Sequence, residues 1–266
     1  MKVTPQQILD ELEIAPGDTL FIKASMRYLG YGPSETSSLL EAILKRIGPE
    51  GTVLMPSFPY SNHVGRAPAG FIFDVLNSPS WMGQLSEKFR RMEDTLRSEQ
   101  YWVPVCARGK YAAKLIAGQR LIMNPYGEGS SYRRMLDYEV KMVGLGVTTN
   151  YNALAHVADA VLASKYSFNM YETEPMQGIV IDVAGNRWET STIIFTQERR
   201  KSMKPSLMIE ASPALQRELR YFVHDGAIIF SLPGPLYFEE SIRVGTEELA
   251  HGRLPPWLGS MIRQTS

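Results

Sequence analysis

A histidine and an aspartate three residues apart are the first side chains in this sequence that could do chemistry together. They are His156 and Asp159. The apolar spacing around them predicts a helix with Asn152 as its N-cap, and residues three apart project from one face of a helix. The core-type residues lie mainly on the other face, so we expect both polar side chains to face solvent or a cleft. A neutral imidazole there accepts a proton, and a nearby carboxylate orients it. The same pattern also fits a solvated helix face, so the choice depends on the rest of the chain.

The composition bounds the class of protein. The chain has 266 residues, of which 44% are apolar and 21% charged, as in soluble globular proteins. Lys plus Arg equals Asp plus Glu, at 28 each, so no overall positive field favours nucleic acid or an anionic membrane as partner. The single cysteine, Cys106, excludes a disulfide framework and cysteine-rich zinc sites, and no histidine motif indicates a metal. No signal-like or membrane-spanning apolar run occurs, so we expect a cytoplasmic protein.

The order of apolar runs, turns and helical patterns predicts an α/β architecture. Strands are expected over residues 19–23, 51–57, 103–107, 140–144 and 227–232. Helices are expected after Thr4, over 39–47, after Ser80, over 110–117, after Ser131, after Asn152, after Ser212 and from Thr246. Residues 178–183 and 187–193 suggest a hairpin. With no linker or repeat, we predict one domain over 1–266 with a variable, substrate-facing region at about 165–211. The long loop over 58–80 is expected to line a pocket.

Two glycine-containing motifs are weak indicators of ligand binding. Gly144-Leu145-Gly146 follows a predicted strand, but Thr149 stands where the dinucleotide fingerprint needs its third glycine. The turn Gly127-Glu128-Gly129-Ser130-Ser131 is not a nucleophile elbow. A plain turn with an N-cap, or backbone amides aimed at a ligand oxygen, both fit it.

With these pieces in view, the chain resembles the aminoglycoside 3-N-acetyltransferase family, also called antibiotic N-acetyltransferases. The likeness runs in unbroken order from about residue 4 to residue 163. The matching segments are Ala24-Ser25-Met26-Arg27-x-Leu29-Gly30, residues 48–58, Phe73-Asp74, residues 78–90, Arg97-Ser98, residues 105–109, the Gly127 turn, His156-x-x-Asp159 and, near the C-terminus, Arg243-Val244-Gly245.

The resemblance implies a three-layer α/β/α fold with a mixed central sheet and transfer of an acetyl group from acetyl-CoA to a primary amine of an amino sugar. It implies His156 as the general base and Asp159 as the acidic residue that orients it. Ser25, Met26, Arg27, Leu29, Gly30, Arg97 and Ser98 correspond to the segments that hold CoA. We expect Asp74, Tyr60 and Glu128 to contact the acceptor, although Asp74 is equally typical of a cap. A homodimer is compatible with these features, and no metal is implied.

Several positions depart from the family pattern. Ala153 replaces a threonine before the histidine, Asp159 shortens the usual glutamate, and Gln100-Tyr101 replaces His-Pro. The region at 165–211 contains a basic run from Arg199 to Lys204, where a polycation site would need carboxylates. The run favours an acceptor from a bacterial glycan or a nucleotide sugar over an antibiotic. The alternative is a catalytically impaired CoA- or sugar-binding module of the same fold.

Overall fold

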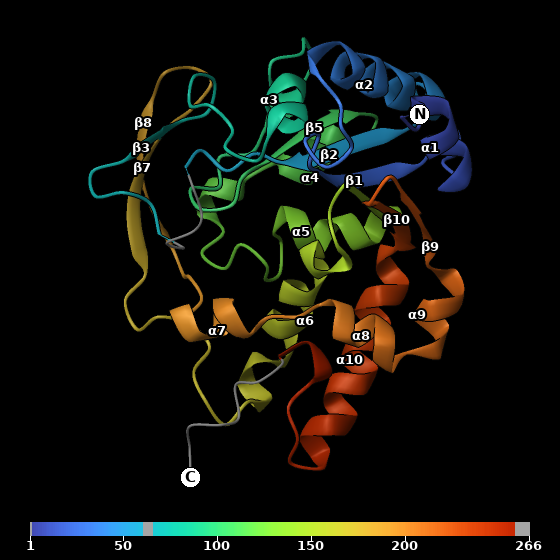
Figure 1. The fold of residues 1–266 in the computed structure, drawn as a ribbon. Helices are drawn as coiled ribbons and strands as arrows, with labels where there is room; N and C mark the ends of the chain where they lie inside the picture. Colours follow the sequence, from blue (N-terminus) through green and yellow to red (C-terminus); the bar gives the residue numbers. More distant parts are fainter. Residues whose placement is uncertain (1, 61–65, 259–266) are drawn as a thin grey trace.

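A mixed seven-stranded sheet forms the centre of the computed structural model, which describes residues 2–60 and 66–258 (Figure 1). Positions 61–65 of the predicted 58–80 loop lie outside the described residues. In sheet order the strands are β4 (Leu96–Arg97), β5 (Val105–Gly109), β2 (Thr52–Pro56), β1 (Thr19–Ala24), β6 (Lys141–Leu145), β10 (Ala227–Pro233) and β9 (Arg220–His224). β1 is parallel to β2 and β6, whereas the other neighbours are antiparallel.

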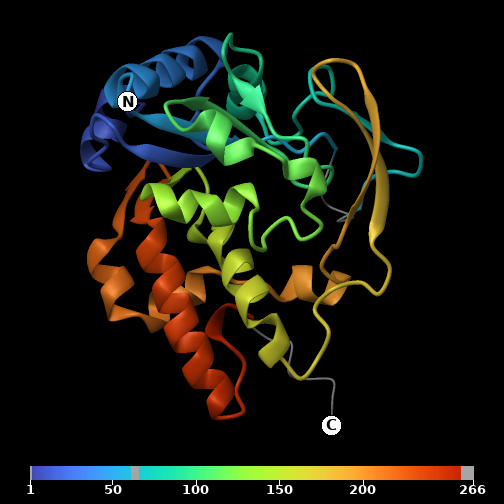
Figure 2. The same ribbon diagram turned by 180° about the vertical axis from the view of Figure 1, so that it is seen from behind.

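Helices cover both faces of this sheet. The helices on one face are α1 (Pro5–Glu11), α2 (Pro33–Ile47) and α3 (Gln84–Arg90). The opposite layer and its flank contain α4 (Ala112–Ile116), α5 (Ser131–Arg134), α6 (Leu154–Leu162), α7 (Gln197–Ser202), α8 (Ser206–Ala211), α9 (Pro213–Glu218) and α10 (Gly234–Ala250). Figure 2 shows α5, α6 and α10 stacked beneath the sheet from behind. This arrangement confirms the predicted three-layer α/β/α fold.

Strand alternation divides the core into two clusters. Leu20 and Ile22 of β1 pack with α1 and α2, while Phe21 packs with α5 and α6. Successive side chains of a strand point to opposite faces, so Lys23 projects on the same face as Phe21. The side chain of Lys23, near the end of β1, therefore lies on the face of the sheet that α6 covers.

A second sheet of three strands lies at one side of the molecule (Figure 1). It consists of β3 (Ile72–Asp74), β7 (Met176–Ile181) and β8 (Arg187–Thr192). The β7–β8 pair confirms the predicted hairpin, and Ile181 lies opposite Arg187. β3 was not predicted, because a three-residue strand that pairs with a segment about a hundred residues away leaves no local signal.

Short 3₁₀ helices complete the described chain. They are Gln119–Leu121, Met135–Tyr138, Thr149–Tyr151, Ala163–Lys165 and Pro256–Leu258. Within the described residues, no helix combines the length and the apolar character needed to cross a membrane.

Two predicted helix starts were wrong. The helix after Ser80 begins only after Gly83. Thr246 lies inside α10 rather than at its start, because Gly245 is a packing residue and not a helix break. A Cβ on Gly245 would lie 2.6 Å from a methyl of Leu162 and 2.8 Å from the Trp257 ring. Glycine at this position allows α10 to approach α6 closely.

The turn before α5 serves as a helix start. Ser130 is the N-cap of α5, and its hydroxyl accepts a hydrogen bond from the amide of Arg133. The amide of Ser131 donates to the side chain of Gln119 at 2.8 Å. These contacts account for the turn as a plain cap.

Candidate active site

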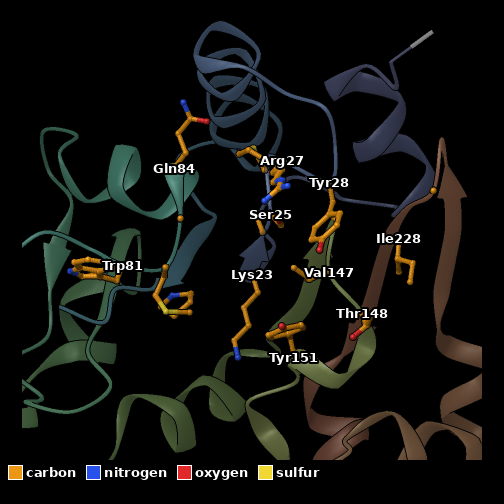
Figure 3. A pocket seen from close by; sticks show the side chains of 17 residues that line it. Lys23, Ser25, Arg27, Tyr28, Trp81, Gln84, Val147, Thr148, Tyr151 and Ile228 are labelled. Carbon is orange, nitrogen blue, oxygen red and sulfur yellow. The ribbon is translucent and has the colours of Figure 1, made fainter. Parts of the chain in front are cut away.

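The three parallel strands end at one edge of the central sheet, and a cavity of about 750 Å³ opens there (Figure 3). β1 lies between β2 and β6, so the connection that leads to β2 and the one that leads to β6 leave this edge on opposite sides of β1. Ligands of open α/β sheets bind outside the carboxyl ends of the strands at such a switch point. We call this cavity the edge pocket; it is lined by residues 23–28, 56, 81–84, 146–148, 151, 226 and 228.

The turn after β1 supplies one wall of the edge pocket. Ser25, Met26 and Arg27, three of the residues expected to bind the donor, line it, whereas Leu29 is buried in the core. Gly30 does not line it and adopts a φ of +67° in the turn. The turn lies against Gly146, where an added Cβ would be 2.6 Å from the carbonyl oxygen of Ser25. Both segments therefore depend on a glycine to form this wall.

Arg97 and Ser98 lie elsewhere. The Arg97 guanidinium donates to three backbone carbonyls, those of Ser57, Val75 and Ser78. It also lies over the Phe73 ring, and burial lowers its pKa to about 10. The Ser98 hydroxyl accepts from the amide of Val105 at 3.0 Å. Neither residue lines the edge pocket, so the structure does not bring them to the Ser25 turn.

Two cations and no carboxylate line the edge pocket. Lys23 extends from β1 toward Tyr151, and Arg27 is exposed on the other side (Figure 3). Trp81, Tyr28 and Tyr151 add exposed aromatic surface at the pocket. The pocket therefore suits a ligand that carries both negative charge and flat or apolar groups.

His156 lies in the first turn of α6 and is only partly exposed. Its ring stacks on Phe195 at 4.9 Å between centroids and lies 4.7 Å from the Tyr126 ring. Among the described residues, its buried Nδ1 has no hydrogen-bond partner. Burial, and then the charges of Arg199 and Lys23, hold the pKa of His156 well below its usual range. The imidazole is therefore neutral at pH 7, and it is a weaker base than a histidine in water.

Asp159 does not face a cleft, and this part of the prediction was wrong. Its side chain is fully buried. Its Oδ1 accepts hydrogen bonds from the Tyr166 hydroxyl at 3.0 Å and the Trp257 indole at 2.8 Å. Its Oδ2 forms an ion pair with the guanidinium of Arg199, which is also fully buried. Tyr166 follows α6 closely in the chain, whereas Arg199 and Trp257 come from distant segments. None of these hydrogen bonds and ion pairs of Asp159 involves His156.

The Asn152 cap is formed, although one residue earlier than a standard N-cap. The helix starts at Leu154, with Ala153 at the N-cap position. The Asn152 side chain accepts from the amide of Leu154 at 3.0 Å. The predicted start of the helix that carries His156 is thus confirmed within one residue.

Of the three predicted acceptor residues, only Tyr60 lines the cavity described next. The Asp74 carboxylate accepts hydrogen bonds from the amides of Leu76 and Asn77 and from the Asn77 side chain. Asp74 therefore caps the turn that follows it. Tyr60 is buried and borders a second cavity of about 650 Å³, which we call the loop pocket and which is lined by residues 59, 60, 66–68, 71 and 81. Glu128 is exposed and lines neither pocket.

Sequence reasoning missed Lys23, Trp81 and Tyr151 as pocket residues. For Lys23 a signal was present, since a lysine ends an otherwise apolar run in a strand with helices on both faces. Trp81 and Tyr151 precede helices, and nothing in their local sequence places them at one cavity.

Comparison with known proteins identifies the family. The family model described as aminoglycoside 3-N-acetyltransferase matches residues 21–219. The chain is 26% identical over 174 residues to the aminoglycoside N(3)-acetyltransferase IV of Salmonella sp; the match covers 65% of this chain and 63% of that relative. The chain therefore spans less than two thirds of the length of this curated relative.

Solved structures show the same fold. Aminoglycoside acetyltransferase AAC(3)-Xa has a TM-score of 0.74 at 23% identity, over 91% of this chain and 92% of the other. AAC-IIIb in its binary complex with CoASH has a TM-score of 0.73 at 19% identity, over 91% and 95%. AAC-VIa bound to sisomicin has a TM-score of 0.74 at 19% identity, over 91% and 97%. On the strength of the family match, which covers most of its length, the chain belongs to the aminoglycoside 3-N-acetyltransferase family.

Proposed function

We propose that this protein transfers an acetyl group from acetyl-CoA to a primary amine of an amino sugar. One observation carries the proposal. The edge pocket is lined by two cations and no carboxylate, and one of its lining residues, Tyr151, lies just before the helix that carries His156. A site for an anionic donor and a candidate base therefore adjoin.

The edge pocket fits acetyl-CoA by its chemistry. Ser25 offers a hydroxyl, and Arg27 offers an exposed guanidinium that suits a phosphate. The exposed rings of Tyr28 and Trp81 suit the flat adenine. A volume of about 750 Å³ lies within the range of small-molecule sites. The CoASH complex of the similar protein AAC-IIIb supports the same donor.

His156 is proposed as the base that takes a proton from the amine as it attacks the acetyl carbonyl. Its buried Nδ1 leaves Nε2 as the ring atom for that proton. A depressed pKa keeps the imidazole neutral but makes it a weak base, so it acts best on the acidic N–H that develops once the new C–N bond has formed.

Asp159 enters the proposal as a positioning residue. Its bonds to Tyr166, Trp257 and Arg199 fix α6 against three other segments. They hold the helix that carries His156 rather than the imidazole itself. Rigid placement of a base within hydrogen-bond reach is a requirement for catalysis.

The acceptor is proposed to enter from the loop pocket. Trp81 lines both cavities, so the two adjoin at its indole, and Tyr60 forms part of the acceptor wall. We retain the preference for a glycan or nucleotide-sugar amine over a polycationic antibiotic. The basic run Arg199 to Lys204 does not support it, because Arg199 is buried and paired. What supports it is the loop pocket, whose described lining residues include Arg66 and no carboxylate.

A binding module of the same fold is the second candidate. The observation that favours it is His156 Nδ1, which has no orienting partner among the described residues. A base without an orienter is less effective, because the tautomer and ring angle are not fixed.

The test is release of free thiol from acetyl-CoA with sisomicin, glucosamine and a uridine-diphosphate amino sugar as acceptors. Acceptor-dependent release supports the enzyme, with the two less cationic amines faster than sisomicin. If acetyl-CoA raises the melting temperature but no amine releases thiol, the binding module is correct. If acetyl-CoA neither raises the melting temperature nor reacts, both candidates are wrong.

A further inference from the structure

Lys23 is a half-buried charge at the edge pocket that the proposed reaction has not yet used. It is the fifth residue of β1, where the strand lies between β2 and β6, and its Cα lies opposite Gly144. Its neighbour Phe21 packs in the cluster that contains α5 and α6, so strand alternation sends the Lys23 side chain to that same layer. Figure 3 shows its amine extending toward Tyr151, at the end of the pocket away from Arg27.

The Lys23 amine is not part of an ion pair in the described part of the chain. Other lysines have carboxylate partners: Lys141 pairs with Asp18 at 2.7 Å, and Lys110 pairs with Glu50 at 2.6 Å. For Lys23 there is no such partner, and burial lowers its pKa to about 8. An ammonium that is half-buried and has no carboxylate partner is held at a cost in free energy, so such a lysine is a candidate for function rather than stability.

The direction of the Lys23 side chain indicates which part of the donor it faces. Its side chain projects into the layer of α6, and its amine extends toward Tyr151, which precedes the helix that carries His156. Arg27 is exposed, whereas Lys23 is half-buried. The two cations of one pocket thus face different parts of a long ligand: Arg27 suits its phosphates, and Lys23 suits the end where the acyl group reacts.

We propose, on the basis of the acetyltransferase function above, that Lys23 is the general acid that protonates the departing sulfur of CoA. The C–N bond forms as the amine attacks, and His156 takes one proton from the nitrogen. The C–S bond then breaks, its electron pair goes to sulfur, and the Lys23 ammonium gives sulfur a proton. The proton held on His156 restores the Lys23 ammonium, so the products are the amide and the free thiol with both side chains back in their starting states.

The charges around Lys23 are compatible with its role as a proton donor. Tyr151 is the pocket residue toward which its amine extends, and Arg27 and Tyr28 line the same pocket further away. With no carboxylate among them, the proton on Lys23 is poorly stabilised and is readily given up. A thiolate is the kind of group that would take it, since thiols ordinarily titrate at about 8.5.

The experiment measures the thiol of bound CoA and needs no acceptor. CoA is held on the wild-type protein and on Lys23→Met at saturating protein, and thiolate absorbance in the ultraviolet is followed against pH. A nearby ammonium favours the thiolate. We expect the pKa of the bound thiol to be at least about one unit lower on the wild type, a tenfold difference in ionisation.

Arg27→Met is the matched control, since it removes the other pocket cation. It should weaken CoA binding and leave the thiol pKa as in the wild type. Lys23→Met should also keep or raise the melting temperature, because it removes a half-buried charge that has no carboxylate partner; a structural lysine would give a lower one. If CoA binds both proteins and its thiol titrates at the same pH, the role of Lys23 is overturned while the proposed function stands. Failure of the wild type to bind CoA would overturn the proposed function as well.

Discussion

Asp159 of α6 and Arg199 of α7 form an ion pair in which both side chains are fully buried. The pair joins the helix that carries His156 to the segment that carries Phe195, on which the imidazole stacks. Tyr166 and Trp257 complete the hydrogen bonding of the carboxylate. The geometry of the candidate base therefore depends on a charge pair that the solvent does not reach.

Asp159→Asn should destabilise the protein by about 3–5 kcal/mol, because the Arg199 charge stays buried without its partner. The asparagine oxygen still accepts from Tyr166 and Trp257, so the loss reports on the charge. The measurement is urea unfolding of the wild type and the variant. The double variant Asp159→Leu/Arg199→Met removes both charges and should lose less than Asp159→Asn. An Asp159→Asn protein with wild-type stability would mean that the pair contributes nothing.

The neutral state of His156 should appear as a pH dependence of stability. Its folded pKa lies well below the ordinary value of 6.5, so below that pH the unfolded chain binds a proton that the folded chain does not. Stability from this group is complete above about pH 6.5 and falls as the pH is lowered.

His156→Phe keeps an aromatic ring in the stack and removes the titration. The unfolding free energy of the wild type, minus that of the variant, should fall by about 1 kcal/mol between neutral pH and about pH 5.5. Other titrating groups are common to both proteins and cancel in the difference. A difference that stays constant with pH would place the pKa of His156 near its ordinary value.

Gly146→Ala should weaken the binding of acetyl-CoA. Gly146 has a φ of +68°, and a Cβ there would press on the Ser25 carbonyl oxygen. The Ser25 turn must then move, and with it one wall of the edge pocket. Gly185→Ala is the matched control, since its φ is +85° but a Cβ would meet no atom within 4 Å. Calorimetric titration should give a weaker Kd for Gly146→Ala only; equal affinities for the two variants would remove this wall from the donor site.

The parts of the site that could be predicted from sequence are those with local signals. Asn152 and the apolar spacing after it placed His156 at the start of a helix, and the polar turn at Ser25 placed the pocket wall after a strand. The partners of Asp159 could not be predicted, because Arg199 and Trp257 reach it only through the tertiary fold. The three-residue spacing suggested that Asp159 orients His156. In the structure, however, the His156 ring stacks on Phe195 and the Asp159 carboxylate pairs with the buried Arg199.

The same distinction explains the rest of the fold. The hairpin of β7 and β8 follows from local alternation and a turn. Its neighbour β3 and the pocket role of Lys23 depend on which distant segments lie beside them. The last helix was expected to begin at Thr246, whereas α10 begins at Gly234 and includes Gly245, which allows the close approach of Leu162 and Trp257.

The most direct measurement of the central claim is the rate at which CoA is released from saturating acetyl-CoA, with the best acceptor of the panel, by the wild type and by His156→Ala. If His156 takes the proton of the amine, kcat should fall about 100-fold or more while the Kd for CoA stays within about twofold. His251→Ala, which changes an exposed histidine at the end of α10, should leave both values unchanged. A His156→Ala protein that releases CoA at close to the wild-type rate would contradict the assignment of His156 as the base.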